Sequence, residues 1–140
     1  MNQRQRKKWL KKNKKWVDPK ECWNLDITIA EFVLPRLKIY KKQTNGYPSL
    51  FNNIEEWKVT LDKMILAFEY VLDDKWEFKP EFDFCLHDFS EEFEGTKIIK
   101  LKTEESSKKY QNYLREVERR QMVIREGMIL FAKYYQSLWW

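Results

Sequence analysis

The chain has 140 residues, a length typical of a single domain with one modest hydrophobic core. Hydrophobic residues make up 43% of it and aromatic residues 16%, with only 3 glycines and 4 prolines, which excludes a wholly disordered chain. No apolar run approaches the roughly 20 residues that cross a bilayer, and the N-terminus lacks the apolar core of a signal peptide. We therefore expect a cytoplasmic, mainly helical protein without a transmembrane segment.

The net charge of +5 is distributed unevenly along the chain. Residues 1–16 carry eight basic residues and no acidic one, which leaves 19 basic and 22 acidic residues in the remainder. Residues 69–94 hold ten acidic residues against two lysines, a net charge of −8. We therefore expect a basic N-terminal segment, residues 1–20, followed by one helical domain, residues 21–140, with an insertion at about 76–104.

The basic segment has the spacing of an amphipathic helix, with apolar residues from Trp9 to Val17 on one side. Lysines neutralise phosphates, and tryptophan stacks on bases or lies at a membrane interface, so nucleic acid and an anionic membrane are both candidate partners. Two other interpretations stay open: a solvated tail, and docking on the chain's own acidic segment. The candidate binding residues are Lys7, Lys8, Trp9, Lys11, Lys12, Lys15 and Trp16.

The first helix of the domain is expected to begin at a cap, Asn24 or Asp26, and to stop at the turn sequence TNGYP. Its apolar side is expected to consist of Ile29, Phe32, Val33, Leu37 and Tyr40. Pro35 lies inside these limits, where it removes one backbone hydrogen bond and clashes with the carbonyl of Glu31. We therefore predict a kinked helix.

A second helix is predicted by apolar residues that recur at spacings of three and four: Ile54, Trp57, Leu61, Met64, Phe68 and Val71. Asn52 or Asn53 can cap its N-terminus, and Glu55 and Glu56 suit the positive end of the helix dipole.

The insertion that follows has no helical period. Phe82, Phe84 and Leu86 alternate with polar residues, and TKIIKLK is a second β-prone run, so we expect a small hairpin or an irregular insertion. The acidic residues in and before it form a candidate surface for a basic partner. They are Asp73, Asp74, Glu77, Glu91, Glu92 and Glu94.

The last helix shows the clearest period, with apolar or neutral residues from Tyr110 to Leu138 at spacings of four and three. Ser106 and Ser107 are the expected N-caps, and the mid-helix Gly127 indicates a close approach of another backbone. The stripe fits an internal core or a partner helix, so a homo-oligomer is an open alternative. The predicted fold class is mainly α: a three-helix bundle with a kinked first helix, a long C-terminal helix and the insertion.

Residues that could carry chemistry are sparse. Cys22 and Cys85 are expected to be plain thiols, and Cys85 with His87 falls well short of the four ligands of structural zinc. Glu31, Asp62 and Glu69 lie near apolar stripes but do not form the paired E-x-x-E motifs with which all-α nucleotide hydrolases hold magnesium. We therefore predict no catalytic residue, metal or cofactor, and keep such a hydrolase as the enzyme alternative.

Three segments resemble a group of small proteins encoded by tailed bacteriophages. They are WNLDITIAEFVLPRLKIYKKQTNGYPS, EEWKVTLDKMILAFEYVLDD and REGMILFAKYYQSLWW, within residues 23–74 and 125–140. The group shares a W-x-L-D-x-T-[IL]-A-x-F-[IVL]-L-P-R-L-K run, a G-[YH]-P turn, an E-E-W helix and an E-G-x-x-L-F-[AG]-K-Y-[FY] ending. The resemblance implies a phage origin and action in the cytoplasm of the infected bacterial cell. It carries over no activity and no catalytic residue, and it covers neither the basic segment nor the acidic insertion.

Taken together, these features lead us to expect a phage-encoded, non-catalytic protein that binds a host or phage macromolecule inside the infected cell, with counter-defence as one such role. The first alternative is a nucleic-acid-binding accessory factor that uses residues 1–16. The second alternative is the magnesium-dependent hydrolase.

Overall fold

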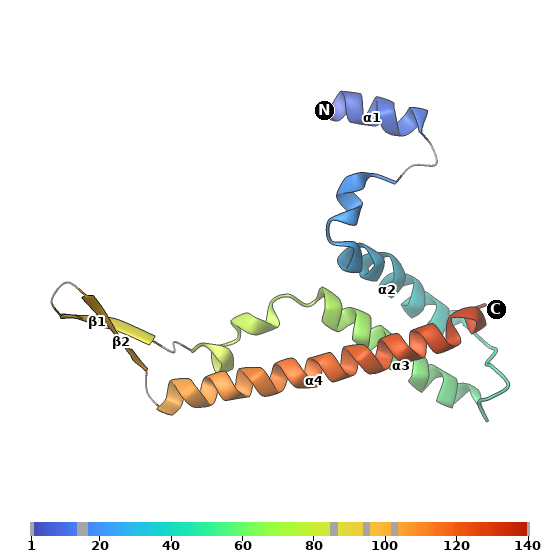
Figure 1. Ribbon diagram of the computed structural model, residues 1–140. Helices are drawn as coiled ribbons and strands as arrows, with labels where there is room; N and C mark the ends of the chain where they lie inside the picture. The colour runs from blue at the N-terminus through green and yellow to red at the C-terminus, as the bar shows by residue number, and fades with distance from the viewer. Residues whose placement is uncertain (1, 14–16, 85–86, 94–95, 102–103, 140) are drawn as a thin grey trace.

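The structure is a computed structural model, and it describes residues 2–13, 17–84, 87–93, 96–101 and 104–139. Its helices are α1 (Gln3–Lys12), α2 (Leu25–Gln43), α3 (Ile54–Leu72) and α4 (Glu104–Tyr134), as Figure 1 shows. Short 3₁₀ turns are η1 (Pro19–Cys22), η2 (Trp76–Phe78), η3 (Pro80–Phe82) and η4 (Tyr135–Ser137). The predicted mainly helical class is confirmed.

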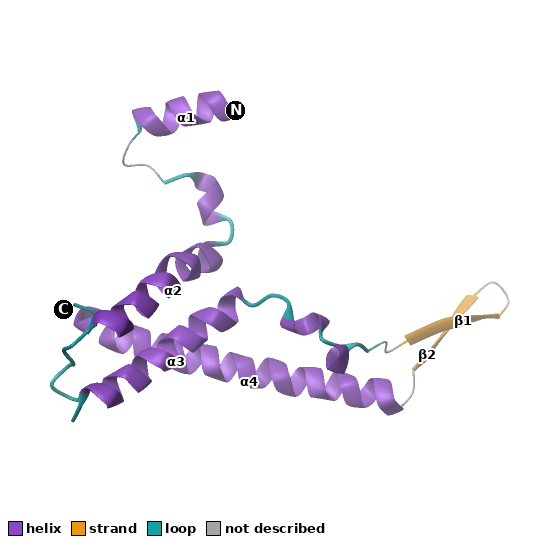
Figure 2. Ribbon diagram, turned by 180° about the vertical axis from the view of Figure 1, so that it is seen from behind, coloured by secondary structure: helices purple, strands orange, loops and turns teal. Residues whose placement is uncertain are grey.

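The central helix of the fold is α3, on which both α2 and α4 pack. Trp57, Leu61 and Met64, one turn apart along α3, are completely buried. From α2, Ala30 and Leu37 join the same core, and Tyr134 joins it from the end of α4. The core is therefore built around one helix whose apolar residues face two neighbours (Figures 1 and 2).

The start of α3 follows from its cap. The side-chain oxygen of Asn53 accepts a hydrogen bond of 2.9 Å from the backbone N–H of Glu56, and the Glu56 carboxylate accepts one of 3.1 Å from the backbone N–H of Asn52. These bonds satisfy donors that the first turn of a helix leaves without partners. The second helix therefore has the cap and the apolar stripe that its sequence predicts.

Pro35 does not interrupt α2, which is one continuous helix from Leu25 to the C-cap Thr44. Asn24 occupies the N-cap position, as one of the two expected caps, although its side chain makes no capping hydrogen bond. Two ion pairs tie α2 to α3: Lys38 to Glu69 at 2.6 Å and Lys41 to Asp62 at 2.5 Å. The kink itself stays a prediction.

Helix α4 has 31 residues and spans about 46 Å. It begins at Glu104, so the predicted N-caps Ser106 and Ser107 are wrong: both lie inside the first turns, after two glutamates that suit the positive end of the helix dipole. Gly127 is buried against α3, as its place in the sequence suggested. A Cβ atom there would lie 2.2 Å from the Cβ of Ala67 and 2.6 Å from the carbonyl oxygen of Lys63.

Residues 76–84 pack back onto α4 instead of forming a strand. The ring of Trp76 stacks on Tyr113 with centroids 5.5 Å apart, and Phe82 and Phe84 contact the same tyrosine. The β-prone run expected at Phe82 to Leu86 is therefore wrong at its start, because Phe82 belongs to η3 and is held by aromatic contacts.

Beyond these turns, β1 (His87–Phe93) pairs antiparallel with β2 (Thr96–Leu101), the second β-prone run of the sequence. The pairing shifts register between Asp88 and Glu91. Because the pairing is interrupted, the choice between a regular hairpin and an irregular insertion stays a prediction.

The contact at Gly127 gives a direct test of the α3–α4 packing. We expect Gly127→Ala to lower the free energy of unfolding by about 1–3 kcal/mol, because the added methyl group has no room between the helices. Urea unfolding measures the change. Gly46→Ala is the matched control: nothing lies within 4 Å of its added Cβ, so we expect a change within about 0.5 kcal/mol. A gain in stability at Gly127→Ala, as helix propensity alone predicts, would contradict this packing.

Candidate interaction surfaces

Helix α1 carries most of the predicted basic residues. Asn2 and Gln5 form a capping box, with reciprocal hydrogen bonds of 2.9 and 3.0 Å, which explains why so charged a segment starts a helix. Lys11 and Lys12 lie in the last turn, where they suit the negative end of the dipole. The cations on one half of the helix are all exposed: Arg4, Lys7, Lys8, Lys11 and Lys12. Of the other predicted residues, Trp9 lies half-buried on the opposite half, and Lys15 and Trp16 fall outside the described residues.

A short series of contacts holds α1 away from the helical core. Arg6 forms an ion pair with Asp18. Asp18 also accepts a hydrogen bond of 3.0 Å from the backbone N–H of Lys20 and so caps η1, and the Thr28 hydroxyl of α2 donates one of 3.0 Å to the carbonyl of Glu21. Figures 1 and 2 both show α1 apart from the acidic insertion. Docking of the basic segment on that insertion therefore finds no support in this arrangement.

The predicted acidic residues divide into two places. Asp73 and Asp74 follow α3 directly, and Glu77 lies in η2, so the structure brings these three together. Glu91 and Glu92 belong to β1, beyond the N-terminal end of α4, and Glu94 is outside the described residues. The acidic surface is therefore not the single patch that the sequence suggested.

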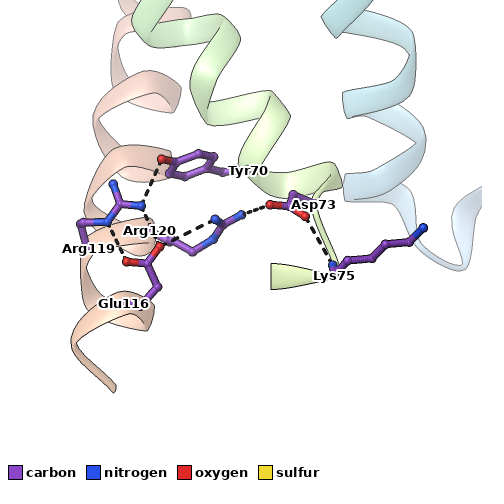
Figure 3. Close-up of polar contacts among 6 residues, drawn as sticks. All are labelled: Tyr70, Asp73, Lys75, Glu116, Arg119 and Arg120. Carbon is purple, nitrogen blue, oxygen red and sulfur yellow. Dashed lines mark hydrogen bonds and ion pairs between the residues drawn. The ribbon is translucent and has the colours of Figure 1, made fainter. Parts of the chain in front are cut away.

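A buried arginine, which the sequence did not single out, lies beside the first three acids. Arg120 of α4 is 6% exposed, and its guanidinium donates a hydrogen bond of 3.0 Å to the Asp73 carboxylate (Figure 3). The guanidinium carbon also lies 4.1 Å from the ring centre of Tyr70 and 4.9 Å from that of Trp76. A buried charge is costly unless it is paired, and here two carboxylates, Asp73 and, at 3.9 Å, Glu116, together with two aromatic faces compensate it.

Next to Arg120, Arg119 binds Glu116 with two hydrogen bonds of 2.8 and 2.7 Å, and donates a third of 3.2 Å to the Tyr70 hydroxyl (Figure 3). The paired hydrogen bonds from Arg119 hold the pKa of Glu116 below its usual range, although partial burial opposes the shift. The same bonds raise the pKa of Arg119. The Glu116 carboxylate also lies 3.9 Å from the Arg120 guanidinium, so this bidentate pair is joined to the buried arginine.

A groove of about 730 Å³ opens beside this cluster, between the start of α2, the end of α3 and one side of α4. Apolar side chains make up most of its floor: Ile29, Phe68, Val71, Trp76, Val117, Ile124, Met128 and Phe131. Carboxylates lie along it at Asp26, Asp73, Asp74 and Glu77, together with the buried Arg120. We call this feature the groove.

The side of α2 that faces solvent is also apolar. Four residues at helical spacing are exposed by 46–60%: Leu25, Ile29, Phe32 and Ile39. We call them the outer stripe of α2. The predicted apolar side of this helix was wrong in part, because Ile29 and Phe32 belong to the outer stripe whereas Val33, Leu37 and Tyr40 pack towards the core. Trp23, just before α2, is 87% exposed.

The candidate residues for metal or nucleotide chemistry do not converge. Asp62 and Glu69 are used in the ion pairs with α2, and Glu31 is exposed elsewhere on that helix. Within the described residues, no group of three or more His, Cys, Asp or Glu side chains could hold a metal ion. Cys85 lies outside the described part of the chain.

Comparison with protein-family models, with curated proteins and with solved structures finds no match. Among the helices described here, none is both long enough and apolar enough to cross a membrane.

The pairing of Arg120 can be tested with two adjacent aspartates. We expect Asp73→Asn to lower the free energy of unfolding by about 1–2 kcal/mol, because it removes the hydrogen-bonded anion of the buried Arg120 guanidinium and leaves only the Glu116 carboxylate at 3.9 Å. The half-exposed position of Asp73 makes this loss smaller than for a fully buried pair. Asp74→Asn is the control. It should be neutral or slightly stabilising, since it removes a negative charge near the C-terminal end of α3. Equal effects of the two changes in urea unfolding would refute the assignment.

Proposed function

We propose that this chain is a non-catalytic interaction protein that binds a host or phage protein inside the infected bacterial cell. The phage setting rests on the resemblance of residues 23–74 and 125–140 to proteins of tailed bacteriophages, and counter-defence is the role that this setting suggests. The arrangement as a three-helix bundle with a first helix kinked at Pro35 also stays a proposal.

The observation that carries the proposal is the outer stripe of α2. A helix that is apolar on two faces normally has both of them covered. Here one face packs on α3, while Phe32 and Ile39 remain 60% and 56% exposed, with Leu25 and Ile29 at 51% and 46%. A row of exposed apolar residues along one side of a helix is typical of a protein-binding surface. Their spacing of four, three and seven residues suits a partner helix laid along α2.

The contact of Arg36 with Phe32 supports the same interpretation. The Arg36 guanidinium lies 3.6 Å from the ring centre of Phe32, and it donates a hydrogen bond of 2.7 Å to the Phe32 carbonyl. Aromatic residues and arginine are enriched at the energetic centres of interfaces, where a ring already held in one orientation loses little entropy on binding.

The nucleic-acid alternative is supported by a different observation, the exposed cations on one half of α1. Five of the six basic residues of this ten-residue helix lie on that half, and the helix has no acidic residue, which suits phosphate contacts. Binding of this kind would depend strongly on salt and would disappear on deletion of residues 1–16.

Phe32→Asp tests the leading proposal. The partner is first captured from infected cells, identified and purified, and its affinity for each variant is then measured by calorimetry. We expect Phe32→Asp to raise the Kd about 30-fold or more, as for loss of a central interface residue, without unfolding the chain, since Phe32 lies outside the core. Val59→Asp, at an exposed position on α3, is the matched control and should leave the Kd unchanged.

Three results would contradict the proposal: an unchanged Kd for Phe32→Asp, turnover of nucleotides by the pure protein with magnesium, or binding of nucleic acid alone. The last of these would be insensitive to Phe32→Asp and abolished by the N-terminal deletion, and would favour the alternative.

A further inference from the structure

The groove leaves the apolar stripe of α4 only partly covered by its own chain. Ile124, Met128 and Phe131 are half-buried and line the groove, although they lie in the middle of the most regular stripe in the sequence. The α4 residues that line it run from Tyr113 to Phe131, which corresponds to about 27 Å along the helix. The groove is therefore long enough to hold a short helix along α4.

The charge at the groove is suited to a cationic occupant. Asp26 lies on the α2 side, and Asp74 and Glu77 lie on the other, after α3. All three are exposed, and in the described part of the chain none of them has an ion-pair partner. Because Asp73 is matched by Arg120, the groove carries a net charge of −3 from these three carboxylates.

The described chain contains one helix with the complementary properties. Helix α1 has ten residues, about 15 Å in length, and six basic side chains without an acidic one. Trp9 and Leu10 lie opposite the half that carries most of the cations. An amphipathic helix of this kind can place its apolar side on a groove floor and its lysines against carboxylates at the rim.

The contacts of α1, which we call the arm, favour docking in the groove of another molecule over docking in its own. The ion pair of Arg6 with Asp18, the cap that Asp18 provides to η1, and the bond from Thr28 to Glu21 hold the arm away from its own groove. Figures 1 and 2 both show α1 projecting from the helical core. We propose that α1 of one copy docks in the groove of a second copy, and that the second copy returns the same contact.

If each copy docks its α1 in the groove of the other, both grooves are filled in one dimer. Each contact is between different surfaces, but a two-fold axis makes two of them and closes the assembly as a dimer. The two contacts act together, because formation of the first holds the second arm near its groove and raises its effective concentration. The groove and the outer stripe share Ile29, but α1 and the acidic residues of the groove take no part in the outer stripe, and Phe32 takes no part in the groove.

Charge exchange between arm and groove provides the test. The arm variant is Lys8→Glu with Lys11→Glu, and the groove variant is Asp74→Lys with Glu77→Lys; all four residues are exposed. Sedimentation equilibrium of the full chain gives the dimer Kd at about 50 and 500 mM NaCl. We expect a wild-type dimer whose Kd rises roughly tenfold or more at the higher salt, because the rim contacts are screened.

Each variant alone should be monomeric, with a Kd at least about tenfold higher, since the substituted residues of α1 or of the groove then face residues of the same sign. An equimolar mixture of the two variants should restore the dimer, because one contact then has wild-type residues on both sides, and in the other the substituted residues of α1 and of the groove have opposite charges. This recovery also shows that both variants are folded. Glu31→Lys with Glu118→Lys is the control: the same change of charge at exposed positions outside the groove should leave the Kd unaltered.

Several outcomes would overturn the proposal. They are a wild-type chain that stays monomeric up to about 1 mM at low salt, a mixture that does not form the heterodimer, and a dimer that both variants form as well as wild type. Retention of the dimer by Phe32→Asp separates this contact from the outer stripe, so failure of either proposal leaves the other standing.

Discussion

The close approach of α3 and α4 at Gly127 is the constraint on which the rest of the structure depends. With Ala67 and the Lys63 carbonyl facing it, the glycine lets two backbones meet where any side chain would force them apart. The ion pair of Lys63 with Glu126 at 2.7 Å lies beside this contact and bridges the same helices. The long helix is thereby held along α3, and its first half extends past the core towards the insertion (Figure 1).

The central position of α3 explains why apolar surface remains uncovered. Both α2 and α4 pack on α3, and the aromatic cluster around Trp57, Phe51 and Tyr134 closes one end of the core. At that end the Tyr40 hydroxyl also reaches the backbone of the C-terminus, 3.1 Å from the Trp139 carbonyl. At the other end α2 and α4 diverge, and the groove lies between them. The outer stripe and the groove therefore both follow from the packing of α2 and α4 on α3 rather than on each other.

The helices of the core and the cap of α3 at Asn53 could be predicted from the sequence, because they depend on local periodicity and local hydrogen bonds. The buried face of α2 could not be predicted from the sequence, because apolar residues surround most of that helix. Tertiary contacts alone determine that Leu37 is buried and Phe32 exposed. The Arg120 site was missed for a related reason: it joins Asp73 to a residue 47 positions later, and no local pattern signals such a pair. The predicted caps of α4 failed because Glu104 already provides a favourable first turn.

The central claim, that one chain buries the inner face of α2 and leaves its outer stripe in solvent, can be measured directly by methyl NMR with a soluble gadolinium agent. At a dilution where the chain is monomeric, the methyl groups of Ile29 and Ile39 should relax strongly, whereas those of Leu37 and Leu61 should be protected. Protection of Ile29 and Ile39 to the level of Leu61 would contradict the account, because it would mean that the chain covers this face itself.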